Sequence, residues 1–411
     1  MSTLIKNISQ LLGIREDGKR FLRGAELREL EGISDAFLEI EDGLISRYGS
    51  MKDCPLGGDD VIDAKGGLVF PGYCDSHTHI VFANTREGEF EDRIRGLSYE
   101  EVAARGGGIL NSVKTLRGMS EEELFQSSKA RCLEVMRMGT TSIEIKSGYG
   151  LDLESEIKML RVARRLGEEL PLQVKTTLLA AHAFPPEFAE DHEGYIDLIC
   201  NSIIPVAAKE GLADYIDAFC ERGYFSADQC ARIFETANHH GLRPKVHVNQ
   251  FSSCGGVQVG LAYDALSLDH LEVMEQLDFD DLSESDTIAT ALPACSFFIS
   301  IPYTPAREIL SSDGIVALAT DYNPGSSPTG NMGFVMSLAC IKMNMTPQEA
   351  LNAATINGAA AMELSHNTGS ITAGKRADLI ITDPMDALAL LPYDFAGSNI
   401  AAVIIAGERL D

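Results

Sequence analysis

Eight runs of apolar and β-branched residues alternate with amphipathic stretches along the central part of the chain. The runs cover residues 68–80, 140–150, 173–184, 214–225, 243–251, 264–272, 286–295 and 314–325. Intervening segments such as 120–139 and 226–241 carry apolar residues at helical spacing. Because neighbouring parallel strands are joined by a crossover, usually a helix, this alternation predicts an α/β fold, a parallel (β/α)8 TIM barrel over residues 69–369.

The two ends of the chain show a different pattern. Residues 1–68 form short β-type runs separated by turns, with a hairpin expected at Asp42-Gly43. The runs 377–383 and 400–410 are similar in character. We therefore expect residues 1–68 and 370–411 to build one small β-sandwich domain together.

Composition limits the classes of partner. The 411 residues are 45% apolar and carry a formal charge of −27, so the surface repels nucleic acid and an anionic substrate needs locally placed cations. The nine cysteines include no CxxC pair and are expected to be reduced. No apolar run reaches the ~20 residues of a membrane span, and no signal peptide is recognisable at the start. We expect a cytoplasmic protein that binds neither nucleic acid nor membrane.

The sharpest local feature is Asp75-Ser76-His77-Thr78-His79 at the end of the first run. Residues i and i+2 of a strand point to the same face, so His77 and His79 would both face the barrel mouth. Two imidazoles on one face can bind one divalent ion, although a hydrogen-bonded polar pair gives the same motif.

Other histidines support the metal interpretation. Active sites of such barrels lie at the carboxyl ends of the strands. Four of the nine histidines, His77, His79, His247 and His270, stand at expected strand ends, and Asp321 follows the last strand. This set is typical of a metal site rather than of scattered core histidines.

The order of these residues resembles that of the amidohydrolase superfamily, over essentially the whole chain. The resemblance implies that His77, His79, His247 and Asp321 hold the metal and that His270 is catalytic. Zn²⁺ or Fe³⁺ suits imidazole and carboxylate ligands.

Many members of that superfamily hold two ions, which a modified lysine on the fourth strand bridges. The fourth run, 214–225, has no lysine. Lys146 lies on the second strand instead, where we expect a structural or charge-balancing role. We therefore expect one ion, Zn²⁺ or Fe³⁺, per subunit.

Further stretches are similar to those of the imidazolonepropionases, at residues 75–90, 96–101, 144–156, 176–185, 267–272 and 320–329. Members of that family hydrolyse 4-imidazolone-5-propanoate to N-formimino-L-glutamate in histidine degradation. The resemblance implies this hydrolysis of a cyclic C–N bond, a small anionic substrate and a homodimer.

The resemblance assigns Arg86, Tyr99, Tyr149 and His182 to substrate binding. Gln250, three residues after His247, and the loop residues Asn323, Gly325 and Ser326 after Asp321 are added by their positions, although some members of the family carry an acid in place of Gln250. An arginine fork is the natural partner of the substrate carboxylate, which favours Arg86 on the loop after His79. The loop after Asp321 can present backbone N–H groups to an anion. A packing role for Tyr99 and a solvent-exposed Arg86 are the alternatives.

The expected mechanism begins with a water whose pKa the metal lowers toward ~7 and which attacks the ring carbonyl. His270 helps to stabilise the oxyanion, and Asp321 moves a proton to the leaving ring nitrogen. Gln250 completes the expected catalytic set through a hydrogen bond to the ring.

Gln250 also separates the alternatives. It stands three residues after His247, where related deaminases carry a glutamate that shuttles protons, and glutamine cannot ionise. The residue therefore argues against a deaminase, and it leaves the identity of the general base open. Another ring hydrolase or aminohydrolase with the same ligands is the alternative function. A barrel that binds ligands without catalysis is a third, which the complete ligand set disfavours.

Overall fold

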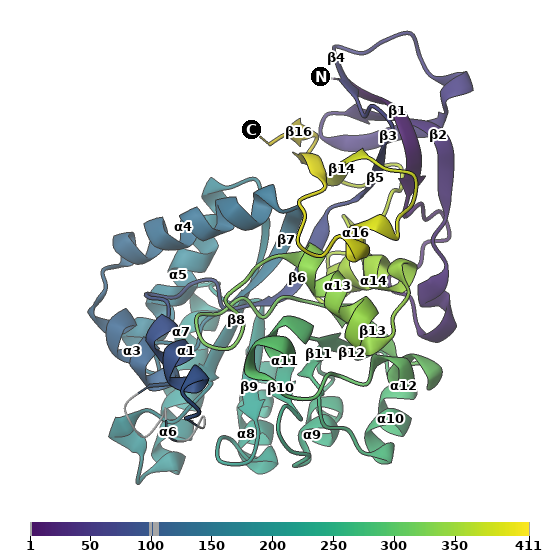
Figure 1. Ribbon diagram of the computed structural model, residues 1–411. Helices are drawn as coiled ribbons and strands as arrows, with labels where there is room; N and C mark the ends of the chain where they lie inside the picture. Colours follow the sequence, from purple (N-terminus) through teal and green to yellow (C-terminus); the bar gives the residue numbers. More distant parts are fainter. Residues whose placement is uncertain (1, 98–100, 102–106, 411) are drawn as a thin grey trace.

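The computed structural model describes residues 2–97, 101 and 107–410 (Figure 1). Tyr99 lies outside the described residues. None of the described helices has the length and apolar character that a bilayer span requires.

Eight parallel strands, each inside one of the eight predicted runs, follow one another around a barrel in chain order. They are β6 (Tyr73–Thr78), β7 (Thr140–Lys146), β8 (Gln173–Ala181), β9 (Tyr215–Cys220), β10 (Arg243–Val248), β11 (Ser267–His270), β12 (Ile288–Ala291) and β13 (Ile315–Leu318). The last strand meets the first through a parallel bridge between Thr78 and Tyr322 and through a hydrogen bond from Asp321 N to His77 O at 3.0 Å. The predicted TIM barrel is confirmed.

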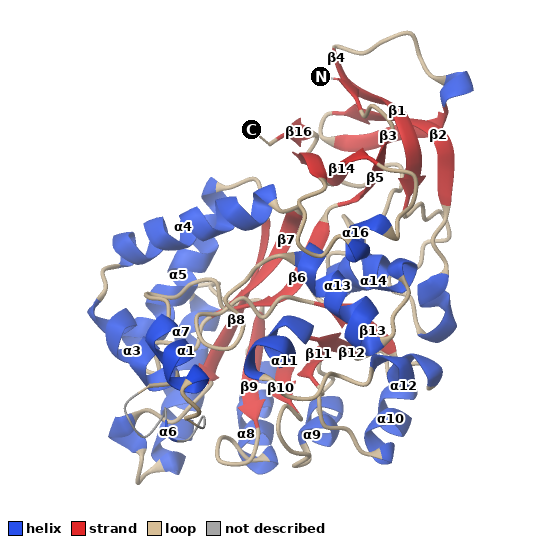
Figure 2. Ribbon diagram, in the orientation of Figure 1, coloured by secondary structure: helices blue, strands red, loops and turns tan. Residues whose placement is uncertain are grey.

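Helices lie around these strands (Figure 2). They are α1 (Glu87–Ile94), α3 (Ile109–Gly118), α4 (Glu121–Arg137), α5 (Leu153–Glu169), α6 (His192–Leu198), α7 (Ile204–Lys209), α8 (Ala227–His239), α9 (Gly256–Ala262), α10 (Gln276–Ser283), α11 (Pro293–Ile299), α12 (Ala306–Ser311), α13 (Met332–Met343), α14 (Pro347–Ala354), α15 (Ile356–Ala360) and α16 (Leu390–Tyr393). The predicted helical segments 120–139 and 226–241 contain α4 and α8, which begin with capping boxes at Ser120 and Ser226. Such caps satisfy N–H groups that the first helical turn leaves free.

The second sheet joins the two ends of the chain. Its strands are β1 (Ser2–Leu12), β2 (Gly32–Glu41), β3 (Leu44–Ser50), β4 (Asp60–Asp63), β5 (Gly67–Pro71), β14 (Leu379–Pro384), β15 (Ile400–Ile405) and β16 (Glu408–Arg409). β5 pairs with β1 on one side and with β14 on the other, so residues from both ends share one sheet and one apolar core. Asp42 and Gly43 both have positive φ, at 49° and 81°, as the predicted hairpin turn between β2 and β3 requires.

The first predicted run, 68–80, divides between the two sheets. β5 belongs to the chain-end sheet and β6 to the barrel, and Gly72 is the only residue between them. A Cβ atom on Gly72 would lie 2.3 Å from the Thr141 side chain, so only glycine fits this crossing. The strand that carries His77 is thus a direct continuation of the small sheet.

Candidate metal centre and active site

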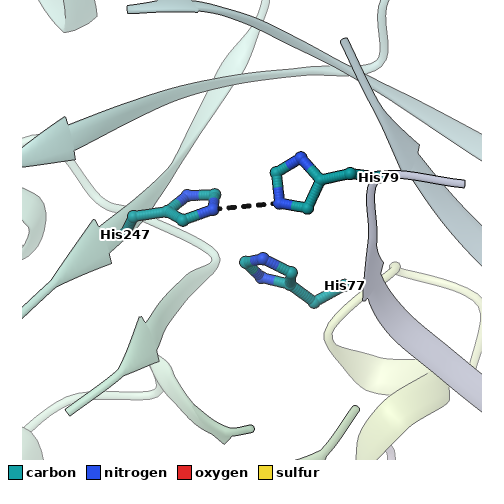
Figure 3. A group of neighbouring side chains, drawn as sticks. All are labelled: His77, His79 and His247. Atoms are coloured by element: carbon teal, nitrogen blue, oxygen red, sulfur yellow. Dashed lines mark hydrogen bonds between the residues drawn. The ribbon is translucent and has the colours of Figure 1, made fainter. Parts of the chain in front are cut away.

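Three imidazole rings converge at the carboxyl end of the barrel strands (Figure 3). His77 lies on β6, His79 directly follows that strand, and His247 lies on β10. One ring nitrogen from each falls within 4.8 Å of the others, and all three side chains are buried. Nε2 of His79 and Nε2 of His247 are 3.3 Å apart.

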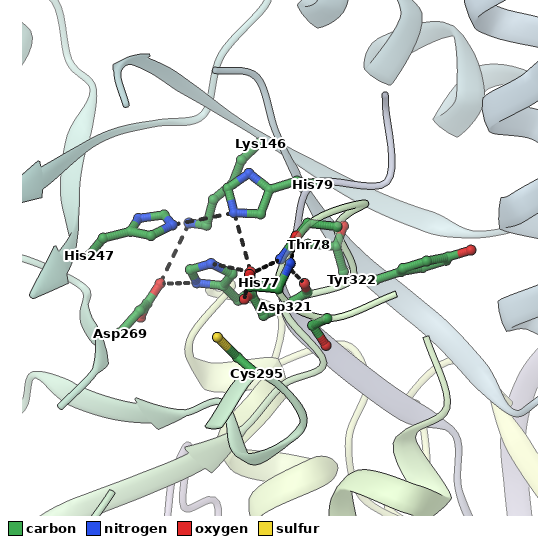
Figure 4. Close-up of polar contacts among 12 residues, drawn as sticks. His77, Thr78, His79, Lys146, His247, Asp269, Cys295, Asp321 and Tyr322 are labelled. Atoms are coloured by element: carbon green, nitrogen blue, oxygen red, sulfur yellow. Dashed lines mark hydrogen bonds and ion pairs between the residues drawn. The ribbon is translucent and has the colours of Figure 1, made fainter. Parts of the chain in front are cut away.

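The carboxylate of Asp321 completes a set of four donors (Figure 4). Its Oδ1 atom lies 3.5 Å from Nε2 of His77 and 3.4 Å from Nε2 of His79. Four donors arranged tetrahedrally around an ion at ~2.1 Å are about 3.4 Å apart. The separations between His79 and His247, His77 and Asp321, and His79 and Asp321 are close to that value, so these donors suit a small cation. Among the described residues, the donors that all lie within 4.8 Å of one another are those of the three histidines, and Asp321 stands beside that group.

Two buried aspartates lie beside two of these rings. Oδ2 of Asp269, on β11, lies 2.6 Å from Nδ1 of His77, and Oδ2 of Asp217, on β9, lies 2.9 Å from Nδ1 of His247. The Asp269 carboxylate holds Nδ1 of His77 as the donor, so the Nε2 lone pair of that ring is directed at the centre. Asp217 faces Nδ1 of His247 at ion-pair distance but outside hydrogen-bond geometry. Nε2 of His77 is buried without a hydrogen-bond partner among the described residues, as expected for an atom that faces a cation.

Electrostatics favour an unprotonated donor set at three of the four positions. Burial lowers the pKa of His79 and holds that of His247 well below its usual value. Burial raises the pKa of Asp321, but the close contacts with His77 and His79 outweigh it, and the pKa lies well below the usual range. At His77, burial and Lys146 lower the pKa, yet Asp269 raises it to about 9, so a cation that binds there displaces a proton.

Backbone strain is concentrated at the same mouth. His270, the last residue of β11, has φ 85°, and Leu271 follows at 61°, a left-handed region that non-glycine residues avoid. The reversal breaks the alternation of the strand, so that both Asp269 and His270 face the site. Nδ1 of His270 lies 3.3 Å from Oε1 of the buried Glu272, and its ring centroid is 5.4 Å from that of His247.

A cavity opens above the proposed ligands. Its lining includes every described residue that the sequence assigned to substrate binding: Arg86, Tyr149, His182, Gln250, Asn323, Gly325 and Ser326. His182 stacks on His79 at a centroid distance of 5.2 Å, and burial lowers its pKa to about 3. Gln250 donates through Nε2 to Sγ of Cys295 at 3.4 Å, which leaves its Oε1 as the atom available to a ligand.

The rim of this cavity holds a buried arginine. Arg86 donates to Oε2 of Glu89 from Nε at 2.9 Å and from Nη2 at 2.6 Å. Its guanidinium lies against Gly325, where a Cβ atom would come within 2.3 Å of Nη1. Arg93 donates to the carbonyl of Gly325 at 2.8 Å. Two arginine side chains therefore lie at the rim of the cavity, although the chain as a whole is strongly acidic.

The loop after Asp321 differs from the sequence expectation. The N–H groups of Gly325 and Ser326 donate to Oδ1 of Asn323, at 2.8 and 2.7 Å, instead of facing an anion. An asparagine side chain commonly closes a turn in this way. In this arrangement the loop shapes the wall around Arg86 rather than offering free donors.

Sequence reasoning missed the carboxylates that orient the site, at Asp217, Asp269, Glu89 and Glu272. A signal exists for Asp217, because it is a charged residue inside an otherwise apolar strand. Such residues are buried only when they are paired. Glu89 lies on α1, where the sequence carries no comparable signal.

The comparisons with known proteins agree with this architecture. The sequence matches the amidohydrolase family over residues 68–410. The imidazolonepropionase of Christiangramia forsetii is 55% identical over the full length of both chains. That of Flavobacterium johnsoniae is 54% identical over 99% of this chain and 100% of its own, and that of Pseudomonas entomophila 46% over 92% and 94%.

Solved structures share the fold at much lower identity. Escherichia coli guanine deaminase superposes with a TM-score of 0.77 at 15% identity, over 100% of this chain and 99% of its own. A triazine hydrolase variant gives 0.78 at 15% identity, over 100% and 94%. The long matches at high identity carry the assignment: the chain belongs to the amidohydrolase family and, within it, to the imidazolonepropionases.

Proposed function

We propose that the protein hydrolyses 4-imidazolone-5-propanoate to N-formimino-L-glutamate in histidine degradation. The observation that carries the proposal is one cavity in which Arg86 stands at the rim and His79, His247, His270 and Asp321 stand at the floor. That arrangement suits a small molecule with a carboxylate at one end and a hydrolysable ring at the other. The relatives named imidazolonepropionase support the same activity.

We propose that His77, His79, His247 and Asp321 hold one Zn²⁺ or Fe³⁺ ion per subunit. The donor separations near 3.4 Å and the unpartnered Nε2 of His77 support the site. When bound, such an ion supplies a Lewis acid that makes water nucleophilic at neutral pH.

The protein's own side chains bind the substrate and stabilise the charge that develops on it. Arg86 binds the propanoate, and the Tyr149 and His182 rings border the flat heterocycle. Oε1 of Gln250 accepts a hydrogen bond from the ring. His270, which Glu272 orients, donates to the carbonyl oxygen as negative charge develops there.

Asp321 has two distinguishable oxygens. Oδ1 faces the imidazoles, whereas Oδ2 lies 3.4 Å from Oγ of Ser326. Oδ2 is therefore the atom that can take a proton from water and return it to the leaving ring nitrogen. The deaminase alternative is not favoured, because Gln250 cannot serve as an acid at the position next to the ligands.

We further propose a cytoplasmic homodimer, because the family resemblance implies a dimer and the reaction is an internal step of amino-acid breakdown. The domain boundaries remain part of the proposal, with residues 1–68 and 370–411 in the small domain and 69–369 in the catalytic barrel.

The test is turnover of imidazolone propanoate by purified protein, followed through loss of the ultraviolet absorbance of the ring. His270→Ala should lower kcat by about 10²–10⁴-fold with its bound metal retained, because His270 stabilises charge and holds no ion. His240→Ala is the matched control, since His240 is exposed at the end of α8, and it should keep full activity. Undiminished turnover in His270→Ala would overturn the mechanism, and absence of turnover in the parent would overturn the function.

A further inference from the structure

A layer of fully buried charged side chains lies directly below the ligand histidines. Its members are Glu144 and Lys146 on β7, Asp217 on β9, Lys245 on β10 and Asp269 on β11. Nζ of Lys146 lies 2.6 Å from Glu144 Oε1, 2.8 Å from Asp217 Oδ2 and 3.5 Å from Asp269 Oδ2. Burial at this depth is costly unless the charges are paired, so the layer needs a role that justifies it.

Lys146 shares its two aspartate contacts with the ligand rings. The Oδ2 atom of Asp269 that faces Lys146 is the atom that also contacts Nδ1 of His77 at 2.6 Å (Figure 4). The Oδ2 atom of Asp217 likewise faces both Lys146 and Nδ1 of His247, the latter at 2.9 Å. One ammonium group thus connects two carboxylates, each of which holds one ligand imidazole.

We propose that Lys146 is a positioning residue of the metal centre, whose ammonium group clamps Asp217 and Asp269 and thereby fixes the His77 and His247 rings relative to each other. The inference rests on the proposed metal centre. Without the ammonium, the two carboxylates lose their shared partner and repel each other. The hydrogen bonds from the backbone N–H of His247 to Asp217 Oδ1 and from Ser267 Oγ to Asp269 Oδ1 remain, but the Oδ2 atoms that face the imidazoles lose their cation. The ligand rings then lose the contacts that direct their Nε2 atoms inward.

Lys245 provides an internal comparison. It is as deeply buried as Lys146 and carries the same charge in the same layer. Its Nζ donates to the Ser76 carbonyl at 2.9 Å and to the Ala361 carbonyl at 3.2 Å, and it pairs with Glu144. None of these contacts is to an aspartate. Burial raises the pKa of Asp269, and the charges of both Lys245 and Lys146 lower it, so removal of Lys245 weakens the field at Asp269 but breaks no contact to Asp217 or Asp269.

The experiment measures Zn²⁺ affinity of the metal-free full-length protein against a competing chelator. Lys146→Met should weaken Zn²⁺ binding by roughly 10–100-fold, the usual cost of losing a group that orients metal ligands. The Zn²⁺ affinity of Lys245→Met should stay within about threefold of that of the parent, even if its melting temperature falls as much as that of Lys146→Met. The visible absorption of bound Co²⁺ should change in Lys146→Met and not in Lys245→Met, because it reports ligand geometry.

Equal Zn²⁺ affinity in Lys146→Met and the parent would overturn the proposal, as would a parallel loss in both lysine variants, which indicates general destabilisation. If Lys146→Met fails to fold, the double variant Glu144→Gln/Lys146→Met keeps the net charge of the layer and still lacks the clamp. It should show the same loss of affinity, and parental affinity in it would overturn the proposal. A parent that binds no Zn²⁺ would instead refute the metal centre itself.

Discussion

The floor and the rim of the cavity are built in different ways. The floor of the cavity and the buried His77 beneath it hold the four proposed ligands, His77, His79, His247 and Asp321, which lie in or just after barrel strands, with buried carboxylates beside two of the rings. The rim residues Arg86, Glu89 and Arg93 belong to α1 and its start, outside the barrel sheet. Strands therefore fix the proposed metal centre, whereas a helix and its flanking loops present the cations that we propose bind the substrate carboxylate.

Loss of a floor ligand should have the largest effect. His247→Ala removes one of three imidazoles, so bound metal should fall below stoichiometric amounts and kcat/KM should drop by about 10³-fold or more. Metal analysis and turnover of the same preparation check this. A variant that keeps both full metal content and turnover would show that the floor is not organised around an ion.

Substitution of a rim residue should leave the amount of bound metal unchanged. Arg86→Ala should raise KM by roughly 10–100-fold, the worth of charge-assisted hydrogen bonds to a carboxylate, with kcat within about threefold of the parent. Steady-state kinetics with a parallel metal assay separate the two effects. If KM stays unchanged, Arg86 has no part in holding the carboxylate.

A smaller rise in KM is expected from substitution of Glu89, which contacts Arg86 and not the substrate itself. Glu89→Gln weakens the pair with Arg86, which it contacts at 2.6 Å, so KM should rise by about two- to fivefold with kcat unchanged. Glu91→Gln on the same helix is the control, because Glu91 is exposed and pairs with Arg95 at the surface. Equal effects from the two variants would mean that Glu89 does not orient Arg86.

The sequence predicted the floor better than the rim. Each barrel strand is an apolar run, and a polar residue at its end is conspicuous, so the sequence already singles out all four proposed ligands, three of which the structure brings together as one group of donors. Asp269 was not predicted as a site residue because it is adjacent to His270, and the strict alternation of a strand allows only one of two neighbouring side chains to face inward. The positive φ of His270 breaks that rule, and no residue type in the sequence announces it.

Two further features lay beyond sequence reasoning for physical reasons. The run 68–80 is continuous in hydrophobicity, yet it crosses from one sheet to the other at Gly72, and hydrophobicity alone cannot mark that crossing. Glu89 looks like any surface glutamate on a helix. Its burial depends on contacts with Arg86 and with the N–H of Gly108, which only tertiary structure brings near.

The position of β5 between β1 and β14 has a consequence for biosynthesis. When β1 and β5 leave the ribosome, β14 has not been made, so one edge of β5 stays open until almost the whole chain has been translated. An open strand edge invites wrong pairing during that interval. We expect the last forty or so residues to act as the closing step of folding, and nascent chains released before β14 to be the most prone to aggregate.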